Sequence, residues 1–370
     1  LLDGKPFSFY WGTDPTADSL HLGHYSSLCM AKRLANAGHH PILLCGGATG
    51  RIGDPRPTAE REIMPEERIV GNIDGIRNQI STYVPTAELV DNYDWTKGYE
   101  FLNFLRDIGK YININYMLDK DIIRRRLESG ITFAEFSYML LQGYDFLHLF
   151  ETKNCIMQVA GSDQWGNITT GVELIRKKLD QTAYAFTMPL ILDSTGKKFG
   201  KSEGNALWLN KEKTSPYEIY QYLINTDDGK VEEYLKVFTF LSKEQIEEVM
   251  KNQNEHPETR IAQKTLAWEV VKDLHGDKEA DNAVSVSEKL FKGDFSGLSV
   301  SEIKTGMKSV PSFDLKEPLP LIDVLVNNKI AQSRREAREF LGSNAISVNG
   351  NIETDENKII GKECAIGGEI

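Results

Sequence analysis

Residues 7–24 read FSFYWGTDPTADSLHLGH, and this stretch indicates the fold class of the chain. Residues 7–11 are apolar and aromatic, as in a buried β-strand, and a turn rich in Gly, Asp and Pro follows them. A helix is predicted from Leu20 to Gly38, and a second strand is predicted over residues 41–45. Strand, helix and strand make one βαβ unit, which predicts a parallel α/β sheet.

The same alternation of apolar runs and amphipathic stretches continues outward to about Leu209. Residues 215–305 are instead rich in Glu, Lys, Gln and Leu with helical periodicity. Three prolines within residues 311–320 indicate a linker. We therefore predict an α/β catalytic domain over residues 1–210, an α-helical domain over 211–310, a linker over 311–318 and a small α+β domain over 319–370.

Composition and charge exclude several classes of protein. The chain has 370 residues, 40% of them hydrophobic and 26% charged, and no apolar run approaches the length that spans a bilayer. The four cysteines are far apart, and the first residues do not resemble a signal peptide, so we expect a cytoplasmic protein without a membrane partner. A net charge of −11 argues against a protein that coats nucleic acid, although a local basic patch remains compatible with RNA binding.

The first motif lies where the first strand meets the helix. Such a junction offers backbone N–H groups and the positive end of the helix dipole to an anion. Gly23 permits close approach, and His21 and His24 are three residues apart on one helix face. The pattern predicts a phosphate site. Taken alone, it leaves open a pair of surface histidines.

The second motif, KKFGKS at residues 197–202, follows a predicted strand over 189–192 and a turn over 193–196. Lysines in a loop that contains glycine form a mobile positive clamp for polyphosphate. Taken alone, such a motif is more often a solvated loop.

In this order and on one α/β core, the two motifs resemble the paired signatures of class I aminoacyl-tRNA synthetases. Four further blocks, residues 46–55, 92–95, 138–146 and 161–167, resemble those of bacterial tyrosyl-tRNA synthetases. The resemblance implies a Rossmann-like catalytic domain, a helical domain and a C-terminal RNA-binding domain. It also implies an enzyme that activates tyrosine with ATP and transfers it to the 3′ end of tRNA(Tyr).

The resemblance assigns residues to a tyrosine pocket. Tyr10 and Asp145 match the pair that hydrogen-bonds the substrate phenol, and a buried hydroxyl needs such partners. Further tyrosine contacts are expected from Thr49, Asp54, Tyr138, Gln142 and Gln164. Without the resemblance, Tyr138 and Gln142 are an ordinary i, i+4 pair on a buried helix.

The resemblance also assigns residues to an ATP site. The residues that match contacts to the phosphates are Thr16, His21 and His24, and those that match a loop closing over the phosphates are Lys198, Lys201 and Ser202. Asp163 matches a ribose contact, and the rest of the nucleotide-binding set is Gly12, Asp14, Gly23 and Arg61.

The implied chemistry is in-line attack of the tyrosine carboxylate on the α-phosphate of ATP, with release of pyrophosphate. A carboxylate is already ionised at neutral pH, so no general base is needed and catalysis comes from orientation and from cations. Mg²⁺ is expected to accompany ATP through the phosphates, with no metal site built from protein ligands.

Two stretches depart from the family pattern. Trp11 stands where a small residue, commonly Cys, often touches the ribose. Residues 55–61 are one residue short and lack the usual lysine; Arg61 aligns with a phosphate-contacting arginine, and Arg56 is a candidate for the missing charge.

A basic helix is expected in the C-terminal domain. Ser333 is a natural N-cap, and Arg334, Arg335 and Arg338 then share a helical region able to grip RNA phosphates. Because acidic residues are interspersed, a charged solvated helix is the alternative.

The resemblance further implies a homodimer, in which Phe133 matches an interface aromatic, although a monomer's core could equally bury it. Two other functions stay open from the sequence. One is a tryptophanyl relative, against which Asp145 beside Tyr10 argues because the pair suits a phenol better than an indole. The other is a synthetase-derived RNA-binding or splicing scaffold, which would have no use for intact phosphate motifs.

Overall fold

The structure is a computed structural model that describes residues 2, 4–55, 61–202, 205–307 and 310–370; the side chains of Lys201 and Ser202 lie outside this description. The chain divides into two compact units. The first comprises residues 1–214 and 232–241, and the second comprises residues 215–231 and 242–370. In the described residues, no helix combines the length and the apolar character that crossing a membrane requires.

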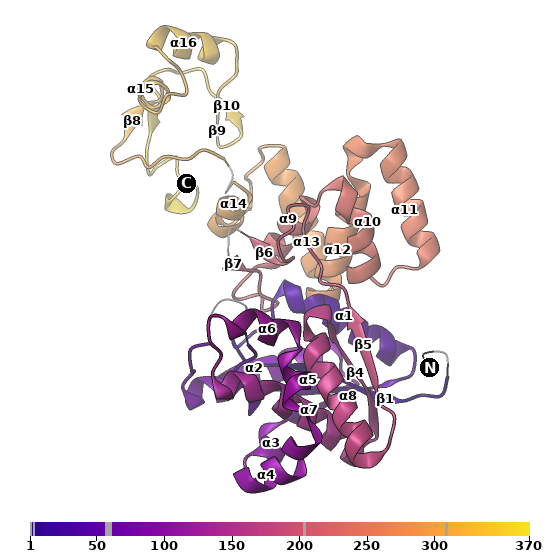
Figure 1. The fold of residues 1–370 in the computed structure, drawn as a ribbon. Helices are drawn as coiled ribbons and strands as arrows, with labels where there is room; N and C mark the ends of the chain where they lie inside the picture. The colour runs from indigo at the N-terminus through magenta and orange to yellow at the C-terminus, as the bar shows by residue number, and fades with distance from the viewer. Residues whose placement is uncertain (1, 3, 56–60, 203–204, 308–309) are drawn as a thin grey trace. The chain divides into compact units, whose positions relative to one another are not determined.

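The first unit is built on a parallel five-stranded sheet with the order β3-β2-β1-β4-β5. Figure 1 labels β1, β4 and β5 of this sheet among the helices of the unit. Its strands are β1 (Ser8–Thr13), β2 (His40–Cys45), β3 (Glu88–Asp91), β4 (Cys155–Gly161) and β5 (Tyr184–Met188). Strand β1 lies at the centre and is buried on both faces, as parallel strands covered by helices are. The expected α/β class is therefore confirmed.

Helices cover both faces of this sheet. Tyr10 contacts Phe146 of α7, whereas the next residue, Trp11, contacts His24 of α1, and neighbouring strand residues point to opposite faces. The longer helices of the unit are α1 (Leu22–Asn36), α2 (Glu66–Tyr83), α7 (Phe133–Lys153) and α8 (Trp165–Leu179). The shorter elements are η1 (Thr49–Arg51), α3 (Tyr93–Thr96), α4 (Phe101–Asp107), η2 (Gly109–Tyr111), α5 (Ile114–Leu118), α6 (Asp121–Leu127), η3 (Ser162–Gln164), β6 (Lys201–Ser202) and β7 (Asn205–Ala206).

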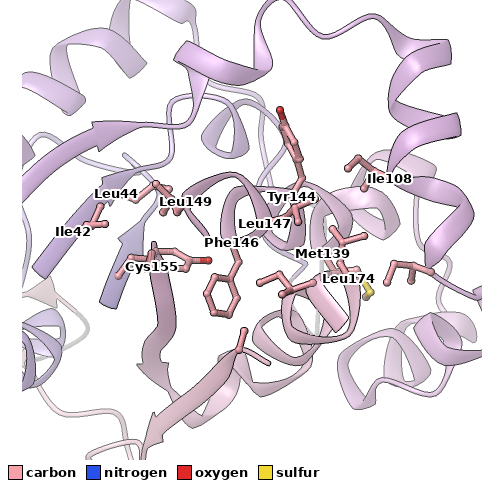
Figure 2. Close-up of a cluster of buried hydrophobic side chains, with 14 of the residues drawn as sticks. Ile42, Leu44, Ile108, Met139, Tyr144, Phe146, Leu147, Leu149, Cys155 and Leu174 are labelled. Atoms are coloured by element: carbon pink, nitrogen blue, oxygen red, sulfur yellow. The ribbon is translucent and has the colours of Figure 1, made fainter. Parts of the chain in front are cut away.

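A hydrophobic cluster fixes α7 against the sheet. Figure 2 shows side chains from β2, β4 and α7 meeting there, among them Leu44, Phe146 and Cys155. Phe146 is fully buried, and the added Cβ of an alanine at Gly171 of α8 would lie 2.9 Å from its ring. Because α7 packs this closely, the polar residues that it carries toward the sheet edge are held on a rigid support.

The predicted strand over residues 189–192 is wrong. The fifth strand is β5, which pairs with β4 and ends at Met188, one residue before Pro189. Proline has no N–H to donate to a sheet. Leu190 and Leu192 are part-exposed, and only an isolated bridge joins Leu192 to Lys198.

The segment 232–241 packs with the first unit, although the sequence places it in the helical domain. The Phe238 ring stacks on Phe199 with 4.4 Å between centroids and lies 5.9 Å from the Tyr25 ring. Arg33 of α1 adds hydrogen bonds to the carbonyls of Val237 and Thr239. The domain boundary at residue 210 remains a prediction. These contacts show that residues 232–241, which lie beyond that boundary in the sequence, pack against the α/β core.

The second unit contains a helical part in which α9, α12 and α13 pack on one another. Its helices are α9 (Pro216–Ile224), α10 (Asp228–Phe238, shared with the first unit), α11 (Lys243–Glu255), η4 (Pro257–Thr259), α12 (Ile261–His275), α13 (Asp277–Phe291) and α14 (Val300–Gly306). Three helices begin with a serine capping box, at Ser215, Ser242 and Ser299. These caps satisfy N–H groups that would otherwise lack partners, so the helix starts are encoded locally.

The C-terminal part is small and mixes helices with short strands. It contains β8 (Leu319–Pro320), α15 (Leu321–Asn327), α16 (Arg334–Gly342), β9 (Ser347–Val348), β10 (Asn351–Ile352), β11 (Ile359–Ile360) and η5 (Ile366–Gly368). As predicted, Ser333 caps α16. Residues 346–351 form a hairpin, with Asn349 and Gly350 at positive φ in its turn. Leu321, Leu325, Ala337 and Leu341 make its apolar core.

Candidate active site

The strand order predicts a binding crevice at the carboxyl ends of β1 and β4. The chain runs outward from β1 through β2 to β3 and then returns to β4 on the other side of β1. Parallel sheets bind ligands where the order reverses in this way. The candidate residues follow the strands directly: Asp14 follows β1, residues 46–54 follow β2, and Asp163 and Gln164 follow β4.

Tyr10 of β1 and Asp145 of α7 are both buried. The Tyr10 hydroxyl is buried and has no hydrogen-bond partner among the described residues. Burial, and then the charge of Asp145, hold the pKa of Tyr10 well above its usual value. Asp145 accepts hydrogen bonds from Asn92 Nδ2 and Trp95 Nε1, each at 2.9 Å. Burial nevertheless raises the pKa of Asp145 to about 7, with smaller effects of these bonds and of nearby carboxylates.

Asn92 links the two halves of the tyrosine pocket. Its Nδ2 donates to Asp145 and also to Thr49 Oγ1 at 3.0 Å, and its Oδ1 accepts from the Ala48 N–H at 2.7 Å. The side chain is fully buried, so these bonds fix it in one orientation. Sequence reasoning noted the block 92–95 but gave Asn92 and Trp95 no role. Asn92 directly follows β3 and Trp95 lies in the short helix α3 after it, and this position at the carboxyl end of a strand is the signal that could have identified them.

Asp14, Thr49 and Tyr138 meet on the other side of Asn92. Asp14 accepts hydrogen bonds from the Thr49 hydroxyl at 2.7 Å and from the Tyr138 hydroxyl at 2.9 Å. Burial raises the pKa of Asp14 to about 6, and these two bonds lower it by less. Both donors are neutral, so among the residues that the structure describes no cation is bonded to this carboxylate. This arrangement suits a ligand that brings a positive charge.

Asp54 forms a second carboxylate site beside the first. It accepts hydrogen bonds from Gln164 Nε2 at 2.9 Å and from Asn167 Nδ2 at 3.0 Å. Burial raises the pKa of Asp54, while these amides and then Arg61 lower it. Arg61 donates from Nε to the Asp54 carbonyl at 3.3 Å. Asn167, which bonds Gln164 as well, is a further residue that sequence reasoning left without a role.

The remaining tyrosine and nucleotide candidates lie around these groups. Gln142 is half-buried on α7, one helical turn after Tyr138. Thr16 is exposed in the loop after β1 and donates its backbone N–H to the Asp14 carbonyl. Gly12 is near the end of β1, where an added Cβ would touch Leu44 at 3.4 Å. Arg56 lies outside the described residues, so its suggested role stays a prediction.

His21 and His24 form the N-terminal cap of α1. His21 Nδ1 accepts from the Gly23 N–H at 3.0 Å, and His24 Nδ1 accepts from the His21 N–H at 3.3 Å. The two rings are 3.9 Å apart. Burial, followed by the charge of His21, lowers the pKa of His24 to about 3. His24 is therefore a neutral hydrogen-bonding group at neutral pH, at the positive end of a helix.

The lysine loop is brought against this helix start by backbone contacts. Gly200 has φ +85°, and a Cβ added to it would lie 2.6 Å from the Gly23 nitrogen. The Leu22 N–H donates to the Leu207 carbonyl at 2.7 Å, which ties the chain after the loop to α1. Phe199 anchors the loop in the aromatic cluster with Phe238. The two motifs, far apart in sequence, thus share one site.

Lys198 shows how the loop meets the end of β4. Its Nζ lies 3.8 Å from Asp163 Oδ2, and both side chains are exposed. An exposed ion pair contributes little and exchanges readily for a ligand's charge. Nothing is described of the side chains of Lys201 and Ser202, whose roles remain predictions.

The three candidate RNA-binding arginines lie apart from this crevice in sequence, on α16. Each forms an exposed ion pair: Arg334 with Asp323, Arg335 with Glu339 at 3.3 Å and Arg338 with Glu356 at 2.6 Å. Both interpretations, RNA contact and solvated helix, are compatible with this geometry.

Family models match almost the whole chain. One described as tRNA synthetases class I (W and Y) matches residues 2–292, and one described as the tyrosine–tRNA ligase SYY-like C-terminal domain matches residues 302–370. Among curated proteins, the tyrosine–tRNA ligase of Bacillus pumilus is 48% identical over 377 residues, covering 99% of this chain and 89% of that protein. That of Streptococcus pyogenes serotype M3 is 48% identical over 359 residues, covering 95% of this chain and 86% of that protein.

Solved structures of aminoacyl-tRNA synthetases are also similar to this chain. A C-terminally truncated mitochondrial tyrosyl-tRNA synthetase from Aspergillus nidulans superposes with a TM-score of 0.71 at 34% identity, covering 78% of this chain and 86% of that chain. A tryptophanyl-tRNA synthetase from Encephalitozoon cuniculi reaches a TM-score of 0.55 at 13% identity over 82% of this chain and 83% of that chain, a likeness of fold alone.

Proposed function

Because the chain belongs to the tyrosine–tRNA ligase family of class I aminoacyl-tRNA synthetases, we propose that tyrosine binds in the crevice after β1 and β4 and ATP at the two signature motifs. The chain is an aminoacyl-tRNA synthetase that uses ATP to join tyrosine to tRNA. The geometry of the crevice supports a role for each of its residues in this reaction.

The buried Tyr10 hydroxyl carries the assignment of the pocket. A buried hydroxyl without a partner is costly, and a substrate phenol placed between Tyr10 and Asp145 supplies the missing hydrogen bond. Thr49, Tyr138, Asp54, Gln142 and Gln164 then surround the substrate's amino end. We place Asp14 with them because it bonds Thr49 and Tyr138, although the resemblance assigned it to the nucleotide-binding set. Asp14 and Asp54 are two part-buried carboxylates whose side-chain hydrogen-bond donors are neutral, and this favours the tyrosine ammonium as their counter-ion.

The nucleotide site is assigned to the start of α1 and the lysine loop. His21 and the neutral His24, with Thr16 and the backbone around Gly12 and Gly23, hold the phosphates by hydrogen bonds, and Asp163 holds the ribose. Positive charge comes from Lys198, Lys201 and Arg61, with Ser202 beside them. Mg²⁺ travels with the nucleotide, held by its phosphates.

The reaction needs orientation and charge. The tyrosine carboxylate oxygen attacks the α-phosphorus, the bond to the bridging oxygen breaks, and pyrophosphate carries away the electron pair. Negative charge grows on the pyrophosphate, where the loop lysines and Mg²⁺ act. The 3′ end of tRNA then takes tyrosine from the adenylate.

Two further parts of the proposal concern assembly. Phe133, Leu102 and Phe101 are 70%, 75% and 63% exposed on the first unit, and such large exposed apolar groups favour a homodimer interface over a monomer's surface. Sedimentation at micromolar concentration tests this.

Arg334, Arg335 and Arg338 hold tRNA phosphates, and the protein works in the cytoplasm.

Amino-acid-dependent exchange of labelled pyrophosphate into ATP tests the substrate assignment. Tyrosine alone is expected to support exchange, without tRNA. Equal exchange with tryptophan or phenylalanine would contradict the pocket, and an absence of exchange with all three would favour the scaffold function.

A further inference from the structure

Four aromatic rings form a row beside the lysine loop. The Trp11 ring meets His24 edge-on with 6.5 Å between centroids and 69° between planes. His24 and His21 are 3.9 Å apart at 33°, and His21 meets Trp208 at 6.1 Å and 66°. The row thus runs from β1, through the cap of α1, to the segment that follows β7.

The backbone fixes both ends of this row. Trp11 lies opposite Leu43 in the parallel pairing of β1 with β2. Trp208 forms an isolated antiparallel β-bridge with His21, and the backbone N–H of Trp208 donates to Thr214 Oγ1 at 2.9 Å. Within the described ranges, the His24 ring in the middle makes one long hydrogen bond, 3.3 Å from the His21 nitrogen, and packs against its ring neighbours. Ring packing therefore decides the orientation of His24.

We propose that Trp11 is a positioning residue that holds the His24 imidazole in place and keeps water away from it. Trp11 is only 4% exposed, so its indole fills the space below His24. A small residue at position 11, which the family pattern leads one to expect, would leave this edge of the imidazole open. The inference rests on the proposed contact of His24 with ATP.

The surroundings of His24 explain why water matters. Burial is the main cause that lowers its pKa to about 3, and His21 on the same cap is the charge that acts on it. On the far side of the row, Lys213 lies 5.3 Å from the Trp208 ring. Trp11 itself brings no charge from β1. Opening the site at position 11 should therefore raise the pKa of His24 toward its ordinary value and loosen its ring.

The experiment compares Trp11→Phe and Trp11→Leu with Phe9→Leu. Phe9 is the matched control, since it is equally buried, lies on β1 two residues earlier and points to the same face of the sheet. Trp11→Leu is expected to lower the rate of adenylate formation about tenfold, with the affinity for tyrosine unchanged. Trp11→Phe should restore most of the rate, because it keeps a ring edge. Phe9→Leu should lower thermal stability and keep the rate.

Proton NMR titration of the histidines supplies a readout that a purely structural role would not move. The His24 resonance should titrate at higher pH in Trp11→Leu and stay where it is in Phe9→Leu. An unchanged titration, or equal rate losses in Trp11→Leu and Phe9→Leu, would overturn the proposal. His24→Ala tests the proposed contact of His24 with ATP separately from the positioning role of Trp11. If His24→Ala leaves the rate of adenylate formation unchanged, His24 does not contact ATP in the reaction, and Trp11 has no catalytic group to position.

Discussion

The Tyr10 hydroxyl and the Asp145 carboxylate are expected to separate tyrosine from phenylalanine, which differ by one hydroxyl. Tyr10→Phe removes one neutral hydrogen bond and should reduce the discrimination by about 1 kcal/mol. Asp145→Asn should cost about 2 kcal/mol, because the carboxylate uses both oxygens, one for Asn92 and one for Trp95, whereas an amide has a single acceptor oxygen. The measurement is kcat/KM for tyrosine over that for phenylalanine. If both variants keep the ratio of the unsubstituted protein, Tyr10 and Asp145 do not hydrogen-bond the substrate phenol.

Tyrosine binding should depend on pH through Asp14, whose pKa is raised to about 6. Below this value the carboxyl takes up a proton, and its attraction for the substrate ammonium is lost. We expect tyrosine affinity to fall about fourfold between pH 8 and pH 5.5 for this reason. Equilibrium binding measures this. 3-(4-Hydroxyphenyl)propionate, which lacks the ammonium group, is the control, and a parallel loss for it would contradict the explanation.

The same pKa values predict how the ligand-free protein responds to pH. A carboxyl whose pKa is higher in the folded state than in the unfolded state stabilises the fold at low pH, and that contribution disappears as pH rises through the folded pKa. The contribution of Asp14 and Asp145 to the free energy of unfolding should therefore fall as pH rises from about 4 to about 7. Asp145→Asn removes one of the two groups, so its thermal unfolding temperature should vary less with pH over this range.

At the scale of elements, α10 supports the lysine loop. Phe238 stacks on Phe199, which directly follows Lys198 in the loop. Phe238→Leu should loosen this anchor and slow adenylate formation about tenfold, while tyrosine affinity stays constant because no pocket residue changes. Phe240→Ala is the control, since this ring is part-exposed in the same segment, beside Lys32 and Arg33. Pre-steady-state rates that fall equally in both variants would contradict the anchor.

At the scale of the whole molecule, adenylate chemistry and tRNA binding are expected to separate. Deleting residues 319–370 should preserve pyrophosphate exchange and abolish most tRNA charging, because the deleted part carries Arg334, Arg335 and Arg338. In the full chain, replacing these three arginines by alanine should weaken tRNA binding and reduce its salt dependence by a log–log slope of about two. Undiminished charging by the truncated protein would mean that this part does not bind tRNA.

The sequence by itself determined the features that are encoded within a few residues. The βαβ pattern of residues 7–45 and the N-cap at Ser333 both appear in the structure, because apolar periodicity and caps act locally. The resemblance carried by the two motifs identified the family. It also named Asp14, Thr49, Tyr138 and Asp145, which the structure brings together at one end of the sheet.

Only the tertiary structure decided how distant segments meet. Asn92 joins Asp145 to Thr49, residues 232–241 pack on the lysine loop, and Trp11 reaches His24 because neighbouring residues of β1 face opposite layers. The raised carboxyl pKa values arise from burial, which no stretch of sequence encodes alone. Residues 189–192 looked like a strand, yet the sheet ends at Met188, because a strand forms only where a neighbouring strand offers hydrogen-bond partners.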